Sequence, residues 1–417
     1  MLNGIMSSRY YLFSVSNLLA AFGGGLILGK ATDIIANPIL HGGSILAFFI
    51  GSVLGLSLLQ FIPKKSTALI TQTFSIGCGL VSLVMFFTYT LTSDNGVLSG
   101  NYGVVFFILL TIRFSLWFFS RVKRASESSG KEQSIAWVEF GYYFGMVLGL
   151  VLWNITGVAI SLVSALILDV ILQTCAGLLD IKGFLIKESK SDIAEHTTTP
   201  TTSINTTYEE NNSDWCKRMA FSVVALTVGI QVIIFHFAHL APSMQTTYML
   251  AVFYSGVALS AFVCNKLKVF LTWDSNQLTS VNFQSNKTKY SLNILTLIFI
   301  MTALMLTIFL NVKNILTGQN FLFILTPVFL IAFLYELISL SLLDRIGYEE
   351  NQSDTQSIIM KTYGMMGVCS AIGFWMLISF KSNLLLTISL LFICTLSTLL
   401  AIFKRVTYES KITKAIC

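Results

Sequence analysis

Stretches of apolar residues recur along the whole chain, each near the length of about twenty residues that a helix needs to cross the hydrocarbon core of a bilayer. Of the 417 residues, 54% are hydrophobic and only 11% are charged, and the mean hydropathy is +0.76. A soluble protein carries roughly a quarter of charged residues. The composition therefore predicts an all-α polytopic membrane protein and excludes a water-soluble globular fold.

Lys and Arg residues alternate between loops in a way that predicts the topology. If both termini lie inside, 21 of the 26 Lys and Arg residues fall in cytoplasmic segments, which is the side that basic residues prefer. No targeting signal is evident, so we expect a multi-pass protein of the bacterial inner membrane with cytoplasmic termini. Topology then accounts for the net charge of +6, and no nucleic-acid partner is expected. The twelve predicted spans are about 10–30, 44–62, 67–90, 103–121, 135–153, 157–179, 219–241, 245–265, 290–312, 320–343, 356–380 and 383–403.

The character of the sequence changes between the sixth and seventh spans. Residues 187–216 are rich in Thr, Ser and Asn and contain almost no large apolar side chains. Such a segment cannot bury enough apolar surface to offset the entropy of ordering it, which predicts a flexible cytoplasmic linker. The linker divides the chain into an N-terminal six-helix bundle, 1–186, and a C-terminal six-helix bundle, 217–417.

The two halves carry traces of an internal repeat. QSIAWVEFG at 133–141 aligns with QSIIMKTYG at 356–364, which is an offset of 223 residues. The same offset carries Arg113 onto Glu336, so the charges within the fourth and tenth spans occupy equivalent places with opposite sign. The repeat predicts two pseudo-symmetric bundles.

Twelve spans, cytoplasmic termini, a polar central loop and two related halves resemble the major facilitator superfamily (MFS) of secondary transporters, over essentially the whole chain. That family carries a G-x-L-x-D-R-x-G-R-K signature after the second span. Here the loop reads LSLLQFIPKK, with Gln60 in the place of the acid and Pro63 in the place of a glycine. The resemblance implies the fold and the class of protein, and this departure leaves the subfamily unassigned.

The fifth span contains glycines at every fourth residue, Gly141, Gly145 and Gly149. They share one helix face and let a neighbouring backbone approach closely. Plain helix packing is one explanation. The resemblance, in which spans two and five pack against spans eleven and eight, implies instead that they form inter-bundle contacts. Lys361 in span eleven is nearly equivalent to Glu139 in span five. Glu139 either reaches the cytoplasmic interface or pairs with Lys361 across the halves, which would close the inner side.

An arginine within an apolar span, as Arg113 is in ILLTIRFSLWFF, costs roughly 2.5–3.5 kcal/mol on insertion scales and normally faces a partner or a wet cavity. The resemblance implies that spans one, four, seven and ten line a central cavity, which would hold Arg113 and Glu336. A guanidinium is suited to bind a carboxylate or phosphate of the substrate. The alternative is a structural ion pair of Arg113 with Glu336 or Asp169. The acids within spans are the candidates for proton coupling, in the order Glu336, Asp169 and Glu139.

Four further residues are candidates for the substrate site. His236 and His239 are three residues apart, so they share a helix face near the outer end of span seven, where they could sense protons or contact a ligand. Histidines at helix ends are also common without such a role, and two of them do not make a metal site. Gln231 lies about one turn below His236. Lys30 ends the first span, where it either reaches the headgroups or adds positive charge to the cavity mouth.

The sequence has no nucleotide-binding loop, no H-E-x-x-H and no G-x-S-x-G motif, and the spacing of its seven cysteines fits no metal site. We therefore expect no enzyme activity, no cofactor and no bound metal. The hypothesis from another class is an intramembrane enzyme that modifies lipids. It would need His or acidic residues clustered at one interface.

These observations predict a monomeric secondary transporter that contacts lipid and moves a small molecule by alternating access, with protons as the coupling ion. Lys30, Arg113 and the two histidines favour an anionic or polyhydroxy-carboxylate solute, such as an organic acid or a carboxylate siderophore. The alternative is a multidrug or metabolite proton antiporter, in which Glu336 or Asp169 contacts a cation.

Overall fold

The computed structural model is almost entirely helical in the residues that it describes. The described residues are 8–30, 43–61, 67–93, 98, 100–127, 134–156, 161–185, 206–241, 243–271, 296–311, 321–349, 365, 368–370, 372–377, 389 and 396.

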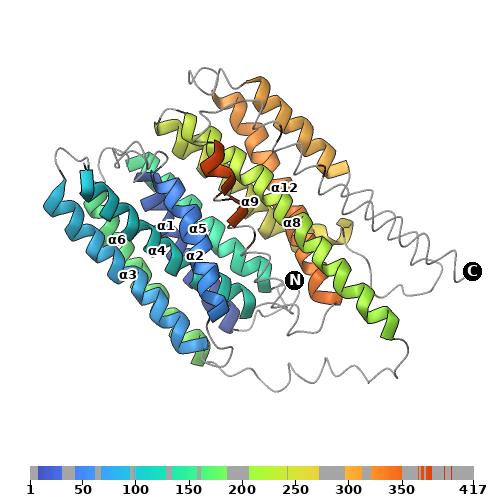
Figure 1. Ribbon diagram of the computed structural model, residues 1–417, viewed down its shortest axis with the longest axis horizontal. Helices are drawn as coiled ribbons and strands as arrows, with labels where there is room; N and C mark the ends of the chain where they lie inside the picture. Colours follow the sequence, from blue (N-terminus) through green and yellow to red (C-terminus); the bar gives the residue numbers. More distant parts are fainter. Residues whose placement is uncertain are drawn as a thin grey trace, which may run out of the picture.

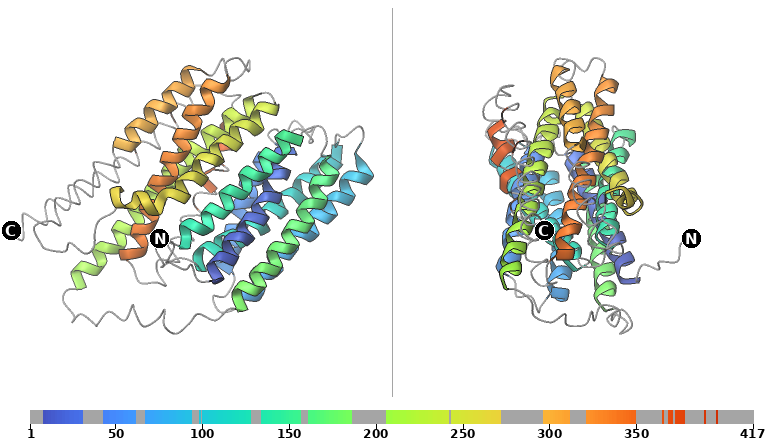
Figure 2. Two further views of the ribbon diagram at one scale, coloured as in Figure 1. Left: turned by 180° about the vertical axis from the view of Figure 1, so that it is seen from behind. Right: turned by 90° about the vertical axis from the view of Figure 1, so that its right-hand side faces the viewer.

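The helices form two bundles that lie side by side (Figures 1 and 2). The N-terminal bundle consists of α1 (Ser8–Lys30), α2 (Gly43–Phe61), α3 (Thr67–Thr92), α4 (Gly100–Glu127), α5 (Ser134–Thr156) and α6 (Leu162–Leu185). The C-terminal bundle contains α8 (Thr206–Leu240), α9 (Ser243–Leu271), a helix at Thr296–Leu310, α12 (Phe321–Glu349) and a helical segment at Val368–Leu377. These bounds confirm the first ten predicted spans to within a few residues at most ends. The spans expected at 356–380 and 383–403 lie largely outside the described residues.

The surface of the helices is that of a membrane protein. Seven of the described helices are long and apolar enough to cross a bilayer. Large apolar side chains point outward, and Leu80 and Leu91 on α3 are 60% and 80% exposed. Because an apolar surface of this kind is stable in lipid rather than in water, the chain is a multi-pass integral membrane protein.

The C-terminal bundle begins earlier in the sequence than expected. Residues 206–216 were predicted to belong to the flexible linker, but α8 starts at Thr206. A polar composition therefore does not prevent this segment from extending the seventh span as a helix.

The glycine ladder of α5 packs within its own bundle. A Cβ atom at Gly141 would overlap the carbonyl oxygen of Ser14, and one at Gly145 would overlap that of Leu18, while Gly149 lies against the next turn of α1. The three glycines thus bring α5 into backbone contact with α1. This corrects the expectation that they form inter-bundle contacts, because the face they share is turned toward a helix of the same bundle.

The pseudo-symmetry of the two halves is visible in how glycines join equivalent helices. Gly51 and Gly55 on α2 lie against the backbone of α4 at Ser115. In the other bundle Gly256 on α9 lies against the backbone of α12 at Phe329. Spans two and four therefore pack as spans eight and ten do, as the repeat predicts.

The contact between the bundles, here called the seam, is formed mainly by aromatic side chains. Helices α5 and α9 lie against each other along it. On α5, the ring of Phe140 lies 5.4 Å from that of Phe262 on α9. On α2, the ring of Phe49 lies 5.1 Å from that of Phe374 in the eleventh predicted span. Spans two and five thus meet spans eleven and eight, as the resemblance implies, but through aromatic rings rather than glycines.

Replacement of Gly145 by alanine is expected to lower the free energy of unfolding by about 1–3 kcal/mol, the usual cost of overpacking a tight contact. The new methyl group would overlap the backbone carbonyl of Leu18, which cannot move without displacing α1. Thermal unfolding of the purified protein in detergent measures the effect. The matched control is Gly77→Ala on α3, where the added Cβ would meet only the flexible end of Leu116 at 3.3 Å. Equal destabilisation of the two variants would contradict the α1–α5 packing.

Candidate functional site

A cluster of charged and aromatic side chains lies where α4 ends and α5 begins, which we call the inner end because it is predicted to be cytoplasmic. Arg121 donates from Nη2 to Oε2 of Glu139 at 2.7 Å and to the hydroxyl of Tyr143 at 3.1 Å. Its guanidinium carbon lies 3.5 Å from the centre of the Tyr142 ring. Arg121, Glu139 and Tyr142 are all buried. The predicted acid Glu139 therefore has a charged partner within its own bundle.

The cluster continues across the seam into the C-terminal bundle. The hydroxyl of Tyr143 on α5 interacts with the carboxyl of Glu336 on α12, and its ring is stacked at 6.2 Å on that of Tyr254 on α9. Next to Glu336, the hydroxyl of Tyr335 lies 3.2 Å from that of Thr227 on α8. Glu336 is only 3% exposed and forms no ion pair with any described residue. A buried carboxyl without a counter-ion is unfavourable when ionised, so this position is suited to take up a proton or a cation.

A second buried network fixes Arg113 within the N-terminal bundle. Arg113 donates from Nε and Nη2 to the two carboxylate oxygens of Asp169 on α6, at 3.1 and 2.6 Å, and both side chains are completely buried. Asp169 also accepts hydrogen bonds from Ser82 on α3 and Gln173 on α6. Gly23 on α1 has no side chain to occupy the space of this carboxylate. The network therefore joins α1, α3, α4 and α6.

The structure thus distinguishes between the interpretations that the sequence left open for Arg113. Its partner is Asp169 and not Glu336, because α4 and α6 belong to the same bundle whereas Glu336 lies across the seam. The charge of Arg113 is balanced by two hydrogen bonds to one carboxylate, and its ring neighbours are Phe114 and Trp117, with centroids 5.2 and 5.3 Å away. A role of Arg113 in substrate binding and a role of Asp169 in proton coupling remain predictions.

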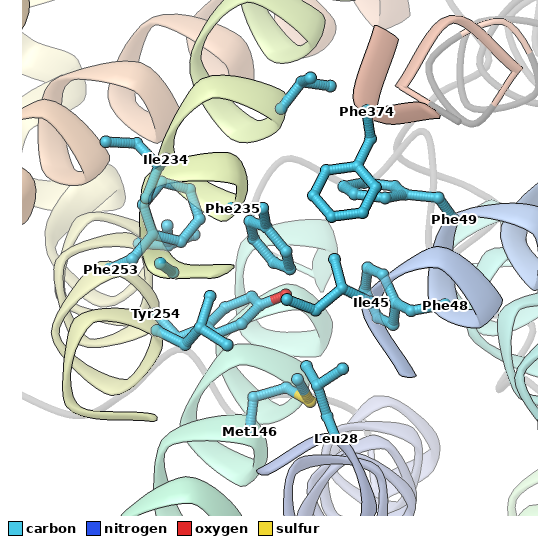
Figure 3. Close-up of a cluster of buried hydrophobic side chains, with 14 of the residues drawn as sticks. Leu28, Ile45, Phe48, Phe49, Met146, Ile234, Phe235, Phe253, Tyr254 and Phe374 are labelled. Atoms are coloured by element: carbon cyan, nitrogen blue, oxygen red, sulfur yellow. The ribbon is translucent and has the colours of Figure 1, made fainter. Parts of the chain in front are cut away.

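Apolar and aromatic side chains from both bundles fill the outer half of the seam (Figure 3). Phe48 and Phe49 on α2 lie 5.9 and 5.4 Å from Phe235 on α8. Figure 3 shows that the hydroxyl of Tyr254 points toward Ile45 within this cluster. This hydroxyl is buried and has no hydrogen-bond partner among the described residues. The seam is therefore apolar in its outer half and polar at its inner end.

The predicted substrate residues on α8 have different surroundings. His236 is 1% exposed, and neither ring nitrogen has a hydrogen-bond partner among the described residues. His239 is half-buried and lies 6.3 Å from the ring of Phe374, which places it at the seam. Gln231 is half-buried. Within the described residues, no three His, Cys, Asp or Glu side chains gather as they would around a metal ion.

Two further predicted residues lie outside the side chains that the structure describes. Lys30 is the last residue of α1, and its side chain is not described. Lys361, the expected partner of Glu139, is not among the described residues.

Arg121 and four tyrosines of the inner cluster, Tyr142, Tyr143, Tyr254 and Tyr335, were not among the site residues predicted from the sequence. Arg121 was counted as one of the basic residues that set the topology, because it ends an apolar span. The useful signal was its combination with Glu139 near the start of the next span, since consecutive antiparallel helices bring such residues to one end of a bundle.

Comparison with known proteins supports the architecture. No family model matches the sequence, and no curated protein is detectably similar to it. Among solved structures, the chain resembles a bacterial homologue of the iron transporter ferroportin, in the outward-facing state with soaked iron, at a TM-score of 0.61 with 11% identity over 95% of this chain and 99% of that one. A second structure of such a bacterial homologue, also outward-facing, gives a TM-score of 0.59 with 11% identity. The match covers 96% of this chain and 99% of that one. At this identity the likeness establishes the fold, which is the MFS-like arrangement of two helical bundles.

Proposed function

We propose that this protein is a secondary transporter that moves a small solute by alternating access, with the bundles separating in turn at the inner and outer ends of the seam. The difference between the two ends supports this proposal. Aromatic rings at the outer half can part and close again without leaving hydrogen bonds unmade. At the inner end the Tyr143–Glu336 contact links the bundles across the seam. The similar solved structures are of homologues of a transporter, which favours transport over lipid modification.

The observation that carries the proposal is Glu336, a buried carboxyl without an ion pair among the described residues, placed where the two bundles meet. While the inner end is closed, the carboxyl is held away from water. When the bundles separate there, water reaches it and can exchange its proton. A group whose access to protons changes with conformation is what couples a proton gradient to transport. Glu336 therefore remains our first choice for the coupling site.

The buried charges favour a cationic solute over the anionic one expected from the sequence. The charge of Arg113 is already balanced by Asp169, while Glu336 lacks a counter-ion among the described residues. This supports the antiporter alternative, in which Glu336 contacts a cation. The similar structures are of a homologue of an iron transporter, so a metal ion is one candidate. The unbonded ring nitrogens of His236 are suited to such an ion.

An anionic solute remains the second candidate, because one donor of Arg113 is unused. Its Nη1 is buried and donates to no acceptor among the described residues. A guanidinium held by Asp169 through Nε and Nη2 could present Nη1 to a carboxylate of the solute. Organic acids and polyhydroxy-carboxylates are the solutes of this class.

Alternating access predicts that a cross-link at either end of the seam stops transport, because each link prevents the bundles from separating at that end. Cysteines at Phe49 and Phe374, whose rings are 5.1 Å apart, report the outer half. Cysteines at Phe140 and Phe262, 5.4 Å apart, report the inner end. In a variant without native cysteines, we expect a cross-link at the outer pair to increase the labelling by a water-soluble reagent of a cysteine at Tyr254. The measurement is the labelling rate in membranes before and after cross-linking.

The control is a cross-link between Trp117 and Tyr142, whose rings stack at 5.2 Å within the N-terminal bundle. This link should leave the labelling of Tyr254→Cys unchanged, because it joins helices that move together. If the outer and inner cross-links give the same labelling as the unlinked protein, the bundles do not rock about the seam and the proposal is wrong.

A further inference from the structure

The guanidinium of Arg121 lies against a group of stacked aromatic rings, here called the tyrosine cage and formed by Tyr142, Tyr143 and, from the other bundle, Tyr254. Its carbon is 3.5 Å from the ring centre of Tyr142 and 5.3 Å from that of Tyr143. The ring of Tyr254, from the other bundle, stacks on that of Tyr143 at 6.2 Å. Both distances from the guanidinium fall within the range of about 6 Å for a cation–π interaction. The cage thus already holds a planar cation, supplied by the chain itself.

Two carboxylates from different bundles lie beside this cation. Glu139 accepts a hydrogen bond from Arg121 at 2.7 Å, and Glu336 interacts electrostatically with both Glu139 and Arg121. When the inner end closes, two acidic side chains approach each other in a setting of low polarity. The positive charge of Arg121 between them reduces their repulsion. Closing this end of the seam therefore depends on a cation in the cage.

Separation of the bundles changes the surroundings of Arg121 and Glu336. Arg121 stays with the N-terminal bundle, because its hydrogen-bond partners Glu139 and Tyr143 both belong to α5. Glu336 and Tyr254 move away with the C-terminal bundle and lose the guanidinium. Once the cage is open to water, a solute cation can exchange with the guanidinium on the ring of Tyr142, and Glu336 is the carboxylate left to bind it.

We propose that the tyrosine cage beside Glu336 is a binding site for a small organic cation of the guanidinium or amine type, and that Arg121 occupies it as a tethered substitute when no such cation is bound. The proposal rests on the transport function above and names its substrate class. Aromatic faces with a carboxylate favour a flat cation that carries N–H donors. They disfavour anions, which Glu139 and Glu336 would repel. Solute and Arg121 therefore compete for one site.

The test measures binding of methylguanidinium to the full-length protein in detergent by isothermal titration. Removal of the tethered competitor in Arg121→Ala is expected to increase the affinity for methylguanidinium at least about tenfold over wild type, in line with a desolvated cation–π site. Adding Tyr142→Leu should abolish this gain, because the aromatic face is lost. The matched control adds Tyr102→Leu instead, an exposed tyrosine near the start of α4, and should keep the gain. Equal affinity in wild type and Arg121→Ala, or a gain that survives Tyr142→Leu, would overturn the proposal.

A second measurement covers the case in which Arg121→Ala does not fold. In the variant with cysteines at Phe140 and Phe262, methylguanidinium should slow cross-linking at the inner end at least about twofold relative to the same concentration of sodium, by competing with Arg121. An unchanged rate would contradict the cage. These results can be told apart from a failure of the transport proposal. If the cross-links change the labelling of Tyr254→Cys but methylguanidinium has no effect, only the cage is wrong. If methylguanidinium binds while labelling shows no rocking, the cage stands and alternating access is wrong.

Discussion

Replacement of Asp169 by alanine is expected to lower the free energy of unfolding by about 3–5 kcal/mol, the typical cost of removing one partner from a buried ion pair. Arg113 would keep its charge, completely buried, after losing the two hydrogen bonds at 3.1 and 2.6 Å. Ser82 and Gln173 would also lose the carboxylate to which they donate. Thermal unfolding of the purified protein and its yield from membranes measure the loss.

A series of variants distinguishes the lost charge from the lost volume. Asp169→Asn keeps the size of the side chain, so it leaves no cavity and should be destabilised by the missing charge and by the loss of one acceptor oxygen. The double variant Arg113→Met/Asp169→Leu removes both charges and should recover most of the stability, because apolar side chains of similar volume often replace a buried pair without loss. If the double variant is as unstable as Asp169→Ala, the pair is not the source of the stability.

The double variant also tests the anionic candidate. Citrate should stabilise neither wild type nor the double variant if the solute is a cation. Citrate that stabilises wild type and not the double variant would return Arg113 to the substrate site, through the Nη1 donor that has no acceptor among the described residues.

The helices and their division into two bundles could be predicted because bilayer thickness fixes the length of each apolar run. The helix against which a given helix face packs could not be predicted. Gly141 and its repeats at every fourth residue show that α5 has a face for close contact, but spacing does not say which helix lies against it. The resemblance favoured the other bundle, and the structure places α1 there. The choice depends on tertiary geometry, which a local pattern does not contain.

The partners of the buried charges also depend on tertiary geometry, which a local sequence pattern does not contain. Arg113 was expected to bind substrate or, alternatively, to pair with one of two acids, Glu336 or Asp169. The internal repeat drew attention to Glu336, because equivalent positions carry opposite charges. Equivalent positions in two bundles are related by symmetry and need not be in contact, whereas Asp169 belongs to the same bundle and meets Arg113 directly. Glu336 is left for a different role.

Replacement of Glu336 by glutamine is expected to abolish the pH dependence of the inner end of the seam and, with it, transport driven by a proton gradient. Closing the seam buries Glu336 beside Glu139, which disfavours its ionised form. Raising the pH should therefore favour the open inner end in wild type. Glutamine keeps the size of the side chain and can still bond to Tyr143, but it neither binds nor releases a proton. The measurement is the rate of cross-linking between cysteines at Phe140 and Phe262 from pH 5 to pH 9, divided by the rate at the same pH for cysteines at Trp117 and Tyr142 within the N-terminal bundle, because thiol ionisation changes both rates.

The choice of a control variant depends on the ionisable groups that face Glu336. Arg121 and Glu139 are charged, and Tyr143 and Tyr335 are the nearby tyrosines. The matched control is Asp180→Asn, which removes a buried carboxyl that bonds to Ser75 on α3, within the N-terminal bundle. We expect this ratio of rates to fall as the pH rises in wild type and in this control, and to be independent of pH in Glu336→Gln. A pH dependence that persists without Glu336 would assign the coupling proton to another group, with Glu139 the next to test because it faces the same seam.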